Sequence, residues 1–323
     1  MPTVPPARAG LARRTPPAIF PPILGLLGVG LAWRAWFDGT DGAGAALAEV
    51  FLGGVAVLYA VALAAWLAKP LRRPSVLAEE IVPLPGLAGM AAACLSGMLL
   101  AAALARWTPG LALGVVVAAL AGIFLVGLGF IAHLLRLPAG QRAVTPVWHL
   151  VFVGPIVSAQ ALAALGYPGA VQVILIPSIA LTVAIWALHA RATLRRPPPP
   201  PLRPLLAIHL APASVLAIAA QRVGYDMLAL LFVAIAVVIF TALALRARWV
   251  TAAGFSPLWG AFTFPMGAFA GALIAVGGIV GPVGWVGGLV LAAASLAVPA
   301  IAWRVMRMWA NGRLAEVTNA ATA

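Results

Sequence analysis

The sequence predicts an all-α integral membrane protein with ten transmembrane helices, arranged as five helical hairpins around a central pore lined by the odd-numbered helices. Its 323 residues are 64% hydrophobic and only 8% charged, with a mean hydropathy of +1.09. Soluble domains carry about 25% charged residues, so a water-soluble globule is excluded. Uncharged runs of about 20 residues, enough to cross a hydrocarbon core of about 30 Å, recur along the chain. Prolines and basic residues repeat in step with these runs.

Ten apolar runs, bounded by charges or by proline and glycine, are the expected spans: residues 17–36, 46–68, 85–105, 110–132, 146–166, 168–188, 204–221, 226–245, 255–278 and 282–303. The first run follows Arg13 and Arg14, as the apolar part of a signal peptide would. Its prolines and its length favour a retained first span instead. Residues 1–15 and 310–323 are then cytoplasmic tails of one membrane domain, residues 16–309.

The basic residues predict the topology, because cytoplasmic loops of membrane proteins are rich in lysine and arginine. With the N-terminus inside, only Arg34, Arg106 and Arg222 of the 20 basic residues fall on the outer side. We therefore expect a multi-pass protein of the cytoplasmic (inner) membrane with both termini cytoplasmic. The net charge of +13 is explained by this topology and by basic residues that attract anionic lipid at the membrane surface. The lipid bilayer, and no nucleic acid, is the expected partner.

The odd-numbered spans share a proline pattern. Spans five, seven and nine each begin with a proline, at Pro146, Pro204 and Pro257, and each carries a second proline two turns later, at Pro155, Pro212 and Pro265. A proline inside a helix removes a hydrogen bond, and lipid cannot satisfy the freed carbonyl. The repeat therefore predicts kinked inner helices around a pore. The alternative is the general enrichment of proline in membrane helices, since Pro177 and Pro299 occur in even spans.

Catalytic and metal-binding signals are missing from the sequence. It has no His-Glu-x-x-His pattern and no paired aspartate motif, and Cys94, the single cysteine, lies in an apolar run. Neither a disulfide nor a cysteine metal site can form within one chain. We expect no enzymatic activity, no cofactor and no bound metal, and we interpret Cys94 as a small buried hydrophobic residue.

Four fragments carry a resemblance to a known family. Residues 255–270, around Phe262-Thr263-Phe264-Pro265, resemble the ninth helix of the tellurite-resistance/dicarboxylate transporter (TDT) family, which includes TehA-like proteins and slow-type anion channels. Residues 203–214 resemble its seventh helix, residues 145–155 its fifth and residues 20–34 its first. The fragments occur in the family's order, and the number of expected spans agrees.

The resemblance implies a homotrimer with one pore per subunit and a phenylalanine that occludes each pore midway. By its place in the fragment, this gate residue is Phe264, or Phe262 if the register differs by two positions. On its own, a phenylalanine in an apolar helix is usually a core residue, so this assignment depends on the resemblance.

Weakly polar side chains are the remaining candidates for pore contacts, because no Asp, Glu, Lys or Arg lies in the middle of any expected span. Without intramembrane ionisable residues a proton-coupled pump is disfavoured. The polar candidates on odd spans are Ser96, Ser158, Gln160, Ser214 and Thr263. Small polar residues also join membrane helices by hydrogen bonds, which is the alternative for each. His149 and His209, one turn inside their spans, are either pH sensors or structural residues.

Together these features predict a gated, channel-like transporter of small inorganic or organic anions, a homologue of tellurite-resistance and C4-dicarboxylate transporters. The alternative is a carrier of C4-dicarboxylates with a discrete binding site. Such a carrier would need cations or hydrogen-bond donors at the midplane, and the sequence offers no cation there.

Overall fold

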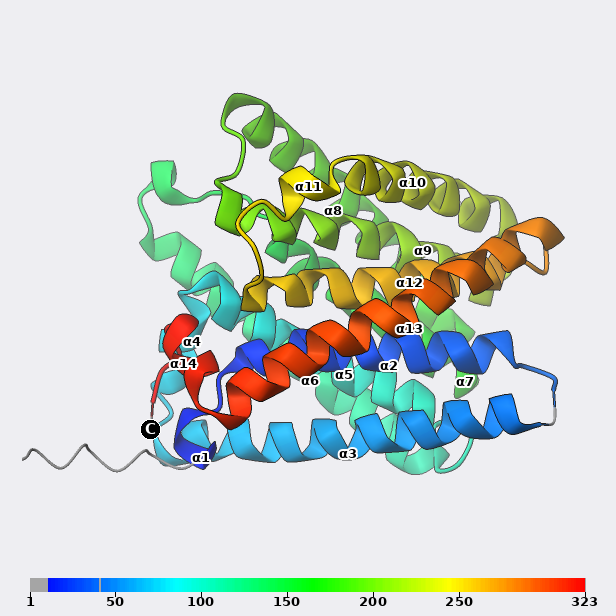
Figure 1. Ribbon diagram of the computed structural model, residues 1–323, viewed down its shortest axis with the longest axis horizontal. Coiled ribbons are helices and arrows are strands. Elements are labelled where there is room, and N and C mark those ends of the chain that lie inside the picture. The colour runs from blue at the N-terminus through cyan, green and yellow to red at the C-terminus, as the bar shows by residue number, and fades with distance from the viewer. Residues whose placement is uncertain (1–10, 41, 323) are drawn as a thin grey trace, which may run out of the picture.

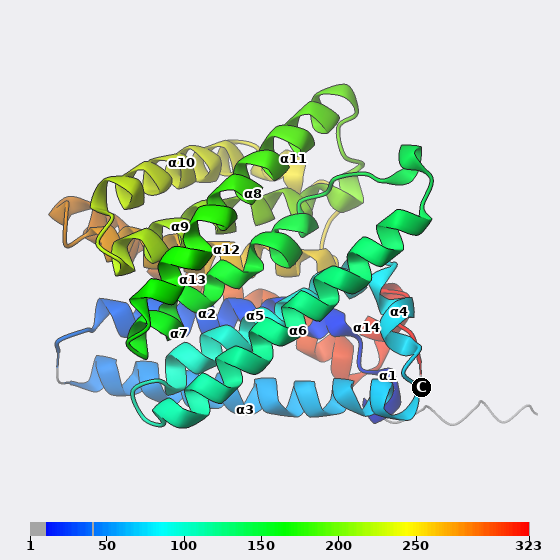
Figure 2. The same ribbon diagram turned by 180° about the vertical axis from the view of Figure 1, so that it is seen from behind.

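The computed structural model describes residues 11–40 and 42–322, and within them every regular element is helical. This confirms the predicted fold class. Arg8 and most of the expected N-terminal tail lie outside the described residues. The long helices run side by side along one direction, with both ends of the described chain at the same end of the bundle (Figures 1 and 2). We call this the proximal end and the opposite one the distal end.

Five inner segments correspond to the odd-numbered expected spans. They are η1 (Pro17–Ile19) with α2 (Phe20–Trp36); α5 (Leu84–Leu104); η3 (His149–Val153) with η4 (Gly154–Ser158) and α7 (Ala159–Ala164); η5 (Pro200–His209) with α9 (Leu210–Arg222); and η6 (Pro257–Trp259) with α12 (Gly260–Val276). Five outer helices alternate with them: α3 (Ala43–Arg72), α6 (Pro109–Arg136), α8 (Pro168–Arg195), α10 (Asp226–Leu245) and α13 (Gly281–Ala310). Short elements connect them: α1 (Leu11–Arg14), α4 (Val76–Ile81), η2 (Ala139–Gln141), α11 (Ala247–Val250) and α14 (Arg313–Val317).

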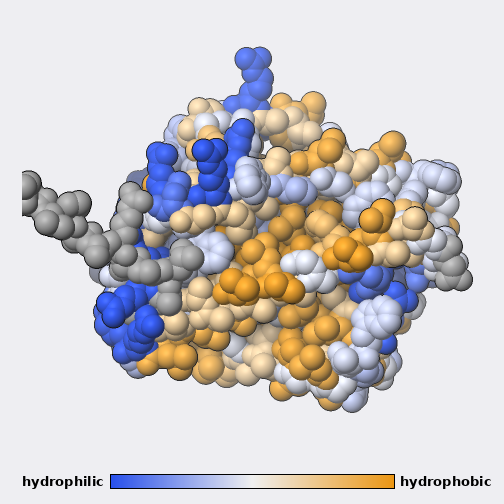
Figure 3. Space-filling view, turned by 60° about the horizontal axis from the view of Figure 1, so that its bottom comes forward, coloured by the Kyte–Doolittle hydropathy of each residue, from blue (hydrophilic) through white to orange (hydrophobic). Residues whose placement is uncertain are grey.

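Burial separates the two sets of helices. In the most apolar stretch of each long inner segment, 61–83% of the residues are buried, against 22–33% in the outer helices. A helix that is apolar on all sides but mostly exposed has to face lipid, whereas the inner segments are surrounded by protein. A hydrophobic belt lies between hydrophilic groups towards the two ends of the molecule (Figure 3).

Nine helices of the described chain are long and apolar enough to cross a bilayer. The remaining expected span, residues 146–166, is shorter and interrupted. It runs as a π-helical turn, a 3-10 segment around Pro155 and a short α-helix. Pro155 has no N–H to donate and Gly154 favours irregular backbone, which accounts for the change of helix type at this point.

Glycines bring the inner segments into close contact. A Cβ atom at Gly25 in α2 would overlap Thr263 in α12, and one at Gly89 in α5 would overlap the backbone of Pro17. Small residues at such crossings allow two membrane helices to approach closely. The Thr263 hydroxyl uses this proximity to donate to the carbonyl of Pro21, at 2.9 Å.

A buried ion pair, which we call the proximal clasp, holds the proximal end together. The Lys69 ammonium pairs with the Glu80 carboxylate, and neither side chain has any exposed surface. Lys69 Nζ also donates to the carbonyl of Thr15 at 2.9 Å, and Trp66 Nε1 donates to Glu80 Oε2 at 2.8 Å. Lys69 is therefore internal, although the topology argument groups it with the basic residues of a cytoplasmic loop.

The C-terminal segment is also docked at the proximal end. In α14 the side chain of Leu314 is fully buried, and Glu316 pairs with Arg14 at 3.3 Å. Trp309 Nε1 donates to the hydroxyl of Thr15 at 3.1 Å. Part of the segment expected as a C-terminal tail is thus folded as a helix and paired with Arg14, just before the first span.

Candidate functional site

A small cavity lies among the proximal ends of the inner segments. It has a volume of about 40 Å³, and all five inner segments contribute to its wall. Its lining side chains carry no charge and no hydrogen-bonding group. Representative residues, one from each segment, are Pro21, Ala88, Leu150, Ile208 and Phe264. We call it the proximal cavity.

A larger cavity of about 480 Å³ lies at the distal end. Its lining residues again belong to the five inner segments or to the connections that directly follow them. Unlike the proximal cavity it contains charged and amide side chains, namely Arg34, Asp38, Arg106, Gln160, Gln221 and Arg222. We call it the distal cavity. No outer helix lines either cavity in the described part of the chain.

Phe264 lies between these two cavities and lines both of them. It also lines a side cavity of about 20 Å³ between α5, α9 and the interrupted fifth segment. Its side chain is only 5% exposed. The ring packs towards Gly28 of α2, where a Cβ atom would lie 3.2 Å from Cδ2 of Phe264. The alternative residue, Phe262, lines none of these cavities, and its ring contacts Trp259 instead.

The three prolines expected to kink the inner helices occupy different local structures. Pro155 lies at the second position of η4, Pro212 at the third position of α9, and Pro265 inside the continuous helix α12. Pro265 lines the proximal cavity and Pro212 the side cavity. Pro155 and Pro212 thus stand close to a junction between two helical segments of different type.

The four small polar candidates form hydrogen bonds with backbone carbonyls. The hydroxyls of Ser96, Ser158 and Ser214 donate to carbonyls three or four residues earlier in the chain, at 2.7–2.9 Å. Thr263 is bonded to Gly260 and, across the helix contact, to Pro21. All four side chains are fully buried, and none lines the proximal, distal or side cavity. Gln160, by contrast, lines the distal cavity.

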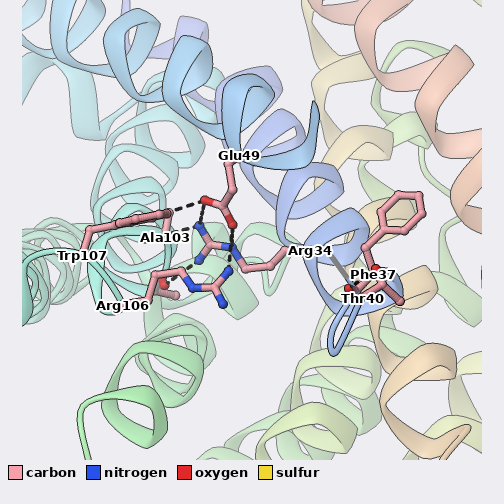
Figure 4. Close-up of polar contacts among 8 residues, drawn as sticks. Arg34, Phe37, Thr40, Glu49, Ala103, Arg106 and Trp107 are labelled. Carbon is pink, nitrogen blue, oxygen red and sulfur yellow. Dashed lines mark hydrogen bonds and ion pairs between the residues drawn. The ribbon is translucent and has the colours of Figure 1, made fainter. Parts of the chain in front are cut away.

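A charged network borders the distal cavity (Figure 4). Glu49 of α3 lies between Arg34 and Arg106. It accepts two hydrogen bonds from Arg34, at 2.6 and 2.8 Å, and one from Arg106 at 3.0 Å. Arg34 also donates to the carbonyls of Ala102 and Ala103, each at 3.1 Å. These carbonyls are in the last turn of α5, where they have no partner within the helix and where the helix dipole favours a cation.

Arg222 completes the basic lining of the distal cavity. It is exposed at the end of α9, and its side chain makes no hydrogen bond or ion pair with another residue in the described ranges. With Arg34 and Arg106 it supplies three positive charges to the lining, against one negative charge from Asp38. These are the three arginines that the sequence places on the outer side. Sequence reasoning did not assign them to a cavity, although all three close an odd-numbered span at the same end.

Three histidines form a hydrogen-bonded chain beside the side cavity. Nε2 of His149 lies 3.1 Å from Nδ1 of His209, and Nε2 of His209 lies 2.9 Å from Nδ1 of His189. His149 is buried and lines the side cavity with Phe264. The chain therefore connects the partly buried His189 on an outer helix to the neighbourhood of the phenylalanine. The sequence analysis named His149 and His209 together but did not predict this contact, because the three histidines come from three different spans.

Comparison with known proteins gives one family assignment. The chain matches the SLAC1 family, described as voltage-dependent anion channel, over residues 14–307. A comparison with curated proteins gives no match. The match covers all five inner segments and both cavities that Phe264 separates, and it agrees with the resemblance found in the sequence. The chain belongs to the SLAC1 family of voltage-dependent anion channels.

Proposed function

We propose that the protein is a gated channel for small anions, in which ions pass along the axis of the bundle between the distal and proximal cavities and the Phe264 ring blocks the passage. Family membership supports anion transport. One observation carries the gate assignment: Phe264 lines the cavities on both sides, and the walls of both are built from the five inner segments.

The closed passage is explained by hydration. Apolar constrictions gate channels by excluding water. The proximal cavity, at about 40 Å³, has room for about three water molecules at 10–15 Å³ each. Its lining side chains offer no polar group that could replace the hydration shell of an ion. An ion therefore has to lose its water to pass Phe264, and this barrier persists as long as the ring stays in place.

The distal arginines account for a preference for anions. Three arginines outnumber Asp38 and the bordering Glu49, which pairs with Arg34 and Arg106, so the distal cavity keeps a net positive charge. This charge raises the local concentration of anions over a Debye length of about 8 Å. A carrier of C4-dicarboxylates, the alternative function, would need a fixed cation close to the barrier. The residues around Phe264 in the proximal cavity are apolar, which favours the channel.

We further propose that the proximal end faces the cytoplasm of a cell whose inner membrane holds the protein. Apart from Arg34, Arg106 and Arg222, the basic residues fall in the tails or in segments assigned to this end, as the positive-inside rule requires. A homotrimer with one pathway per subunit is proposed from the resemblance to the TDT family alone. Any role in tellurite resistance belongs to the same proposal.

The test is anion flux from liposomes that contain the full chain. We expect Phe264→Ala to conduct chloride or nitrate at least tenfold faster than wild type, because it removes the ring that borders both cavities. Phe262→Ala is the matched control. It removes the same kind of side chain at a position two residues away that lines neither cavity.

The outcomes separate the gate from the transport function. Equal anion flux in Phe264→Ala and wild type refutes the gate assignment. Potassium flux that rises as much as chloride flux refutes anion selectivity. Saturable exchange of succinate by wild type, with no chloride flux in either variant, would support the carrier instead.

A further inference from the structure

A groove of about 890 Å³ opens on the side of the molecule, away from the candidate pathway. Two outer helices, α3 and α6, form its walls, and the inner helix α5 forms its floor. The segment from Pro70 to Ile81, which includes α4, closes it at the proximal end. Because outer helices line it, this lateral groove faces the lipid, whereas only inner segments surround the cavities on the axis.

Small residues create the space in the lateral groove. Ala93, Cys94 and Gly97 lie on its floor, and Ala118 and Gly122 are among the small residues on its α6 wall. Aliphatic and aromatic side chains surround this floor, and the hydroxyl of Tyr59 is already bonded to the carbonyl of Ala93 at 3.0 Å. Such a surface has apolar contacts to offer and no free hydrogen-bonding group in its middle part.

The length of the groove matches the depth of a membrane. Its lining residues on α6 extend from Val115 to Arg136, which is roughly 31 Å at 1.5 Å per residue. The hydrocarbon core of a bilayer is about 30 Å thick. The volume of about 890 Å³ falls in the range of about 300–1,000 Å³ typical of pockets for small molecules. The groove is therefore long enough to hold the acyl chain of a lipid from one leaflet, which crosses about half of that depth.

The basic residues at the proximal mouth of the groove indicate which head group the ligand carries. His133 and Arg136, in the last turn of α6, line the groove there, and no acidic residue lines it. Neither side chain makes a hydrogen bond or ion pair with any other residue that the structure describes. Basic pockets between membrane helices bind anionic lipid head groups, and a guanidinium can hold a phosphate through two parallel hydrogen bonds.

We propose that the lateral groove binds an anionic phospholipid from the leaflet at the proximal end, with an acyl chain along α5 and the phosphate held by Arg136 and His133. The same helix α5 lines the proximal cavity through Ala88 and Ala92. A bound lipid therefore packs against one of the inner segments that surround the candidate pathway. The proposal concerns binding and can be tested without any flux measurement.

Cys94 is a built-in reporter for occupancy of the groove, because it is the single cysteine of the chain and lies on the groove floor. Delipidated full-length protein in detergent is mixed with phosphatidylglycerol or with phosphatidylcholine. Bound lipid is counted by native mass spectrometry, and the labelling rate of Cys94 by N-ethylmaleimide is measured in parallel. We expect phosphatidylglycerol to bind more tightly and to slow labelling more than phosphatidylcholine does.

Two pairs of variants locate the site. Arg136→Gln should weaken phosphatidylglycerol binding about fivefold, the equivalent of about 1 kcal/mol for one basic residue at the membrane surface. Arg191→Gln, at an exposed arginine that does not line the groove, should leave it unchanged. Ala118→Trp should fill the groove and abolish lipid retention. Ala121→Trp, at an exposed position of the same helix outside the groove, is its control.

Three results would overturn the proposal. They are equal binding of both lipids, unchanged phosphatidylglycerol binding in Arg136→Gln, or unchanged retention in Ala118→Trp. Protection of Cys94 that grows with protein concentration and ignores lipid would assign the groove to a second copy of the chain. None of these results depends on Phe264 or on anion flux, so this proposal and the proposed function fail separately.

Discussion

Removal of one partner from the proximal clasp should destabilise the protein strongly. In Glu80→Gln the side chain keeps its shape and can still accept the hydrogen bond from Trp66, but the ammonium of Lys69 loses its counter-charge. Both side chains are fully buried, so water cannot replace the lost carboxylate. The carbonyl of Thr15 alone would then face the charged group.

The magnitude follows from the burial of both charges. Breaking a buried ion pair on one side costs about 3–5 kcal/mol, because an uncompensated charge remains inside. At about 2 °C per kcal/mol for a chain of this size, the melting temperature should fall by roughly 6–10 °C. The double variant Lys69→Met with Glu80→Gln removes both charges and keeps an acceptor for Trp66. It should recover most of the loss, since buried pairs are often replaced by uncharged residues with little change in stability.

The assay is thermal unfolding in detergent, followed by tryptophan fluorescence and by the onset of aggregation. Glu79→Gln is the matched control, because Glu79 is the adjacent residue and also belongs to an ion pair. Hydrogen bonds from Arg73 lower the pKa of the Glu79 carboxyl. Both side chains of that pair are more than 40% exposed, so its loss should have little effect. Equal melting temperatures for Glu80→Gln and Glu79→Gln would refute the reasoning.

Two further predictions concern the distal cavity and the packing of the inner segments. Arg222→Gln should slow chloride flux through the open Phe264→Ala channel about twofold at low salt, because a unit charge acting over a Debye length of about 8 Å contributes about 0.5 kcal/mol in water. The effect should disappear at high salt, and Arg191→Gln should show no loss. A salt-independent loss would contradict an electrostatic role. Gly89→Ala should cost about 1–3 kcal/mol or more through overlap with the backbone of Pro17. Gly114→Ala, where a Cβ meets nothing within 4 Å, should be neutral or stabilising in the same melting assay. Equal melting temperatures would show that the inner segments can move apart at this crossing.

The sequence was sufficient to predict the alternation of inner and outer helices. Apolar runs of membrane length and the one-sided distribution of arginines specify hairpins, because lipid tolerates only helices with satisfied backbones. The proline pattern pointed to the odd spans, and those segments are the buried ones. The proline pattern could not predict local geometry, since α3, α8 and α13 continue through Pro70, Pro177 and Pro299. Whether a helix type changes at a proline depends on neighbouring segments, which a local pattern does not contain.

Side-chain direction was the main limit for the candidate site. Ser96 and Ser214 lie on inner helices, but a serine in a membrane helix can bond the carbonyl four residues earlier, and both do so. Which face of an inner helix meets the axis is set by packing among all five segments. Clusters that join distant parts of the sequence could not be predicted either. One example is the hydrogen-bonded row of His149, His209 and His189. Their spacing in the sequence carries no signal of contact.

The positions of the charges make the proposed barrier one of hydration and not of electrostatic repulsion. Arg34 is compensated by Glu49 and by two carbonyls of α5, so its charge stays at the distal end. Beyond Phe264, the lining of the proximal cavity is apolar, so an anion meets no fixed charge of either sign there. Once the ring is removed, no charge remains to hold the ion back. Any dependence of flux through Phe264→Ala on salt should therefore come from screening of the distal arginines. A channel that stayed closed without the ring would place the barrier elsewhere in the inner segments.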